Sequence, residues 1–136
     1  MTEPAVVIRE GRQKAVLRRH PWIFSGAIKT VTGDPADGDL VAVRGERGEF
    51  LARGYWNSQS AICVRLLSWD EGQPLDEAFW RERLRRAIAA RQPLNRIAAQ
   101  GTPAAYRLVN AENDGLPGLV VDRCGAWLVI QALTLG

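Results

Sequence analysis

Short apolar runs separated by turn-forming residues dominate the first half of the chain. Residues 5–8 form a β-branched apolar run, which is typical of a strand. Residues 40–44 and 49–55 flank a glycine-bounded turn at 45–48, and this segment predicts an antiparallel hairpin. Residues 60–67 alternate between two faces, as a further strand would. Several short strands at this spacing indicate a compact β-barrel of about 70 residues.

One segment of this region does not alternate. Residues 12–18 favour a short basic helix, and Pro21 ends it because proline fixes its own φ and excludes the preceding residue from helical space. Trp22, Ile23 and Phe24 then follow in succession. We expect all three side chains to turn inward as a rigid apolar plug, with the arginines before them at its rim.

A second unit begins after the turn-rich stretch of residues 68–74. Asp76 is a good N-cap for a helix, which we expect to end near Gln92 because Pro93 follows. Strand-like segments come next, at residues 106–109, 116–122 and 127–133. The predicted fold class is mainly β with α+β: a barrel over residues 1–70, then an incomplete unit of a helix and a β-hairpin over residues 71–136.

The second unit leaves one sheet face and one strand edge without cover in this prediction, and such edges rarely stay open. We expect it to close either by forming a homodimer or by pairing with the remainder of a longer protein.

Composition narrows the class of protein. Hydrophobic residues make up 46% of the chain and charged residues 24%, as in globular proteins, and no apolar run approaches the roughly 20 residues that cross a bilayer. The N-terminus lacks the pattern of a secretory signal, so we expect a cytoplasmic protein without a membrane partner. Cys63 and Cys124 form neither a disulfide framework nor a metal cluster, and we expect reduced thiols.

Positive charge is concentrated in two places. The formal net charge is only +3, yet residues 9–29 hold six cations against the single anion Glu10. A second cluster of arginines lies at residues 81–91 on the predicted helix. The first cluster predicts contact with nucleic-acid phosphates. For the second cluster, a solvated face is at least as good an interpretation as a binding surface.

Few side chains suggest catalysis. His20 is the only histidine and precedes Pro21, so a loop-capping hydrogen bond is the main interpretation and an RNA contact the second. Tyr55 and Trp56 stand at a strand corner beside polar Asn57 and Ser58, where stacking on bases and packing in the core are equally supported. No glycine-rich turn joins a strand to a helix, and we therefore predict no catalytic residue, metal or cofactor site in this chain.

Three motifs in order resemble one family. Residues 20–28 (HPWIFSGAI), 54–67 (GYWNSQSAICVRLL) and 106–123 (YRLVNAENDGLPGLVVDR) are similar to the large-subunit ribosomal RNA cytosine-C5 methyltransferases, a bacterial class I type dependent on S-adenosylmethionine. The resemblance implies an N-terminal PUA barrel that binds RNA, a small central domain, and a Rossmann-like domain with the S-adenosylmethionine site and a catalytic cysteine. It covers only the first of these domains and part of the second.

Two positions depart from the family pattern. Arg19 stands where the family often has glycine, and residues 110–113 replace a common His-Gly-Glu-Ala. Any role that depends on those family side chains is therefore not expected here.

The resulting hypothesis is a PUA-like, RNA-binding N-terminal part that docks ribosomal or other structured RNA for a methyltransferase domain outside the chain. That domain would transfer methyl from S-adenosylmethionine to cytosine C5. The alternative is a stand-alone PUA-like interaction module that self-associates, with RNA binding incidental. The candidate RNA contacts are Arg12, Lys14, Arg18, Arg19, His20, Tyr55, Trp56, Asn57, Ser58 and Arg65.

Overall fold

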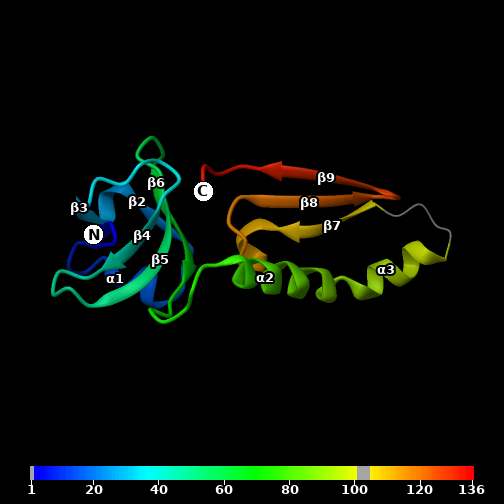
Figure 1. Ribbon diagram of the computed structural model, residues 1–136, viewed down its shortest axis with the longest axis horizontal. Coiled ribbons are helices and arrows are strands. Elements are labelled where there is room, and N and C mark those ends of the chain that lie inside the picture. The colour runs from blue at the N-terminus through cyan, green and yellow to red at the C-terminus, as the bar shows by residue number, and fades with distance from the viewer. Residues whose placement is uncertain (1, 101–104) are drawn as a thin grey trace. The chain divides into compact units, whose positions relative to one another are not determined.

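Two separate sheets form in the computed structural model, which describes residues 2–100 and 105–136 (Figure 1). The six-stranded sheet belongs to a unit that runs to Gln73 and includes Leu135 and Gly136. The three-stranded sheet belongs to a unit spanning Pro74–Thr134. None of the described helices is long and apolar enough to cross a membrane.

The first unit is a curled sheet with one short α-helix. Its strand order is β2-β6-β5-β4-β1-β3, and only the β1–β4 pair is parallel. The predicted barrel strands and helix are all present, which confirms the mainly β fold. The elements are β1 (Ala5–Ile8), α1 (Gln13–Leu17), β2 (Trp22–Phe24), the 3-10 turn η1 (Ser25–Ala27), β3 (Ile28–Thr32), β4 (Leu40–Arg44), β5 (Phe50–Trp56) and β6 (Ile62–Ser68).

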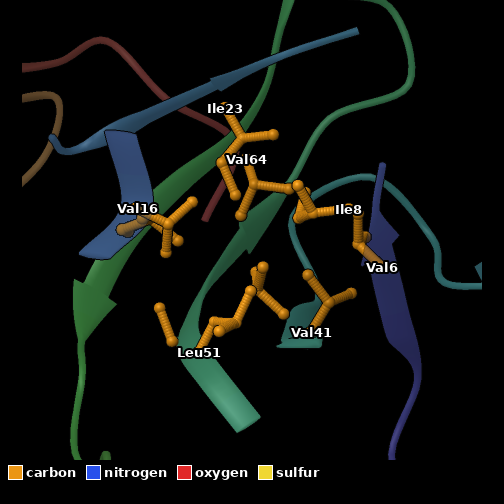
Figure 2. Close-up of a cluster of buried hydrophobic side chains, with 10 residues drawn as sticks. Val6, Ile8, Val16, Ile23, Val41, Leu51 and Val64 are labelled. Atoms are coloured by element: carbon orange, nitrogen blue, oxygen red, sulfur yellow. The ribbon is translucent and has the colours of Figure 1, made fainter. Parts of the chain in front are cut away.

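The core of this unit gathers aliphatic side chains from the inner faces of the strands and from α1. Ile23 on β2 is 2% exposed and pairs with Val64 on β6, and the two side chains point into the same cluster in Figure 2. Trp22 is half-buried, whereas Phe24 is 49% exposed. The expectation that all three turn inward was therefore wrong. Because β2 is a strand, successive side chains alternate, and only the middle one reaches the core.

The second unit packs helices against a small antiparallel sheet in the order β7-β8-β9. Asp76 caps its first helix as predicted, accepting the Phe79 N–H at 3.0 Å. That helix ends before Pro93, but a second one, not predicted, begins at Gln92. Proline is tolerated there because the first N–H groups of a helix have no intrahelical partner. The elements are α2 (Glu77–Ala90), α3 (Gln92–Ala99), β7 (Ala105–Asn110), the 3-10 turn η2 (Ala111–Asp114), β8 (Leu119–Cys124) and β9 (Trp127–Ala132).

The small sheet has one buried face, and its outer strand β9 is exposed. Val109 and Val121 pack with Leu116 and Ala87 in a core of their own. Every residue of β9 is exposed, including Trp127 at 77% and others with long apolar side chains. An uncovered strand was expected here; whether a second copy or another segment covers it stays a prediction.

Candidate nucleic-acid interface

The cations of the first basic cluster divide into two groups. Lys29 forms an ion pair with Glu46, and hydrogen bonds from Lys29 and from the Glu10 N–H lower the pKa of that carboxyl, with a smaller electrostatic effect from Arg9. Apart from Arg9, which contributes to that effect, the other four cations are exposed and form no ion pair within the part of the chain that the structure describes. They are Arg12, Lys14, Arg18 and Arg19, all on α1 or at its ends.

The surface near the first turn of α1 differs in charge from the helix itself. A hollow of about 470 Å³ near its first turn is lined by Glu10, Gln13, Glu46, Arg47 and Glu49. Three carboxylates there would repel phosphate, which excludes this hollow from an RNA surface. The cations along α1 and at its ends carry the opposite charge and are the better candidates for contact with phosphate.

The C-terminal end of α1 has a defined geometry. The N–H of Arg19 donates to the Val16 carbonyl at 2.9 Å and the N–H of His20 to the Ala15 carbonyl at 3.0 Å, which together make a Schellman motif. Arg19 occupies the left-handed position of this motif, at φ +63°. Its guanidinium lies 5.5 Å from the ring centroid of Trp69.

A row of aromatic and cationic side chains continues from this point. The backbone N–H of Trp22 donates to Nδ1 of His20 at 3.2 Å, which confirms the predicted loop-capping role of that histidine. The two rings meet edge to face at 6.0 Å. Arg65 lies 5.6 Å from the Trp22 ring centroid and pairs in register with both Trp22 on β2 and Tyr55 on β5. Trp22, Tyr55 and Arg65 are far apart in the sequence but lie on the same face of the sheet.

The side chains at the strand corner after Tyr55 already have partners within the first unit. Trp56 packs against the core. The Asn57 side-chain oxygen accepts the Gln59 N–H at 2.9 Å, and Ser58 donates through its N–H and Oγ to the Asp37 carboxylate at 2.6 and 3.1 Å. These polar groups hold the turn. RNA contact by Trp56, Asn57 and Ser58 stays a prediction.

The arginines of α2 are engaged within their own unit. Hydrogen bonds from Arg85 and Arg86 lower the pKa of Glu82 to about 2. Arg91 pairs with Asp114 through two bonds of 2.7 and 2.8 Å. The other contacts of this kind are Arg81 with Glu77 and Arg83 with the Gly115 carbonyl. The second basic cluster is therefore largely neutralised by local partners.

The described residues do not suit a nucleoside cofactor. The connection from β1 to α1 holds the single glycine Gly11, and that from β6 to α2 holds only Gly72. Neither forms a glycine-rich cradle. Burial raises the pKa of the Cys63 thiol, which disfavours the reactive thiolate. No cluster of three potential metal ligands occurs among residues 2–100 and 105–136. We therefore assign no step of methyl transfer to these residues.

One residue near the candidate interface was not predicted from the sequence. Trp69 lies 53 positions from Val16, yet its indole N–H donates to the Val16 carbonyl at 2.7 Å. It stands in the turn-rich stretch that predicted a domain boundary, and no local pattern indicates its contact with α1.

The first unit is similar to a known type of domain. Residues 6–69 match the model of a PUA-like domain. The whole chain is similar to Ribosomal RNA large subunit methyltransferase I, at 41% identity for Salmonella arizonae and 44% for Aeromonas salmonicida. These matches cover 98% and 96% of this chain, which spans only 32% of each relative's length.

A solved structure shares the fold. A putative S-adenosylmethionine-dependent methyltransferase from Streptococcus mutans superposes with a TM-score of 0.76 at 17% identity. The match covers 96% of this chain and 33% of that one. At this identity the likeness shows the arrangement of elements alone.

Proposed function

We propose that this chain is the RNA-binding N-terminal part of an S-adenosylmethionine-dependent methyltransferase that acts on large-subunit ribosomal RNA. In this proposal the first unit docks structured RNA, and a domain outside the chain transfers the methyl group to C5 of a cytosine. The proposal is supported by the match of residues 6–69 to a PUA-like domain and by relatives named as ribosomal RNA methyltransferases.

The observation that carries the RNA-binding role is the contrast between the two arginine clusters. Arginines on α2 lie against carboxylates and a carbonyl. Arg12, Lys14 and Arg18 have no such partner among the described residues and remain exposed. Cations whose charge is not neutralised locally release counterions from RNA when they meet phosphates, and this release drives binding. The row of His20, Trp22 and Arg65 begins beside them and offers rings and a guanidinium for shape-selective contacts.

A charge-matched pair of variants tests this role. One replaces Arg12, Lys14 and Arg18 with glutamine, and the other replaces Arg81, Arg85 and Arg86 with glutamine. Each removes three positive charges from a formal net charge of +3. Filter binding to transcribed large-subunit ribosomal RNA, measured at several salt concentrations, gives affinity and its salt dependence.

We expect only the α1 variant to bind weakly, with the slope of log affinity against log salt reduced by about 2 to 3 for three lost phosphate contacts. The α2 variant should bind like the wild type, because its arginines already have partners. An equal effect in both variants would show that net charge, not this surface, governs binding.

The methylation step needs its own test on the full-length protein. Transfer to C5 replaces the hydrogen at that carbon, so ribosomal RNA labelled with tritium at cytosine C5 should release tritium when S-adenosylmethionine is added. Methylation without tritium release would place the methyl group elsewhere and contradict the C5 assignment.

A further inference from the structure

The backbone of Arg19 adopts a conformation that suits glycine. Its φ of +63° lies in the left-handed region, where a Cβ approaches the following carbonyl oxygen and raises the energy of ordinary residues. The Schellman hydrogen bonds from Arg19 and His20 hold the chain in this conformation. Glycine is the usual residue there because it has no Cβ. An arginine at this position is therefore tolerated at the expense of local stability.

The side chain of Arg19 is held in place as well. Its guanidinium lies over the ring of Trp69, at 5.5 Å from the centroid. That ring is itself fixed, since its N–H donates to the Val16 carbonyl at 2.7 Å and its body packs against the barrel core. This contact is to an aromatic ring and engages no carboxylate. Arg19 is exposed and has no ion-pair partner in the described ranges.

We propose that Arg19 is a preorganised phosphate-binding residue, which presents the edge of its fixed guanidinium to one backbone phosphate of the RNA. The inference rests on the proposed RNA-binding function and names a specific contact within it. A planar guanidinium binds phosphate through two parallel N–H groups, and holding it on a ring beforehand reduces the entropy lost on binding. Non-glycine residues held in the left-handed region cluster at functional sites, and the conformation of Arg19 therefore adds to the reasons for this hypothesis.

Arg18 provides a matched control on the same helix end. It is exposed like Arg19, but its backbone has an ordinary φ of −82° and no ring contact is recorded for it in the described structure. We expect it to act through charge alone. Lysine keeps the charge but lacks the planar fork, so the exchange of arginine for lysine should separate the two roles.

The experiment compares Arg19→Gly, Arg19→Lys and Arg18→Lys by thermal melting and by filter binding to transcribed large-subunit ribosomal RNA. We expect Arg19→Gly to melt at the wild-type temperature or a few degrees higher, because the backbone strain is relieved, while its affinity falls about tenfold. Arg19→Lys should lose about threefold or more with an unchanged salt slope. Arg18→Lys should lose less affinity than Arg19→Lys, because only the contact of Arg19 needs the planar fork.

Several results would overturn the assignment. If Arg19→Gly binds as tightly as the wild type, Arg19 has no role in binding. If it melts lower and binds equally, the stacking on Trp69 is structural. Equal losses in the two lysine variants would mean that charge alone acts at both positions. A wild-type chain that does not bind RNA would overturn the proposed function itself, which distinguishes that failure from the others.

Discussion

Replacing Ile23 with alanine should destabilise the first unit far more than replacing its neighbour Phe24. Ile23 is 2% exposed and faces Val64, which is fully buried, within the core shown in Figure 2. Truncation removes three buried carbons, worth about 0.8 kcal/mol each in transfer from water. The cavity adds to this loss, so we expect about 3 to 4 kcal/mol in the free energy of unfolding.

The Phe24 side chain lies on the opposite face of β2 and is 49% exposed. Its recorded ring contact is an edge-to-face approach to Trp22, with centroids 6.4 Å apart. Such pairs contribute about 0.5 to 1.5 kcal/mol, and we expect Phe24→Ala to lose about 1 kcal/mol. Ile23→Val removes a single buried carbon and should lose about 0.5 to 1.5 kcal/mol, well below the loss in Ile23→Ala.

Amide hydrogen exchange of β5 and β6 is the suitable assay, because the chain has two units and a single unfolding transition cannot be assumed. A loss of 3 to 4 kcal/mol corresponds to exchange about a hundred to a thousand times faster. Faster exchange in Phe24→Ala than in Ile23→Ala would refute the assignment of faces on β2. An Ile23→Ala effect below about 1 kcal/mol would refute its place in the core.

Two further predictions concern close packing and charge. At Gly54 an added Cβ would lie 2.2 Å from the Arg65 carbonyl oxygen, so Gly54→Ala should lower the free energy of unfolding of the first unit by about 1 to 3 kcal/mol, as measured by hydrogen exchange of β5 and β6. At Gly26 no atom lies within 4 Å of the added Cβ, and Gly26→Ala should change this free energy little. Although burial raises the pKa of Asp114, hydrogen bonds from Arg91 and a backbone N–H outweigh it, and the pKa is held below the usual 3.8. The second unit should therefore lose stability as pH falls through that lowered pKa, and Asp114→Asn should cost about 3 kcal/mol at neutral pH and abolish this dependence in acid-unfolding curves.

The sequence alone determined those elements whose signals are local. The hairpin of β4 and β5 follows from alternating residues on either side of a glycine-bounded turn, and α2 begins at the Asp76 cap. Each of these patterns depends on hydrogen bonds between residues that are close in the sequence. The whole pattern therefore lies within one short segment and can be recognised without the tertiary structure. Each of the three motifs is likewise a continuous segment, and their resemblance to RNA methyltransferases could be recognised from the sequence alone.

Only the tertiary structure decided which faces meet. Three apolar residues in succession at 22–24 do not specify which one of them a strand buries, and pairing with β6 selects Ile23. Both basic clusters look alike in the sequence. In the structure Arg91, just after α2, pairs with Asp114, which is 23 positions away, whereas Arg19, just after α1, contacts the ring of Trp69. Such contacts depend on how distant strands and helices pack. The sequence locates the positive charge along the chain, but packing determines which cations have a local ion-pair partner.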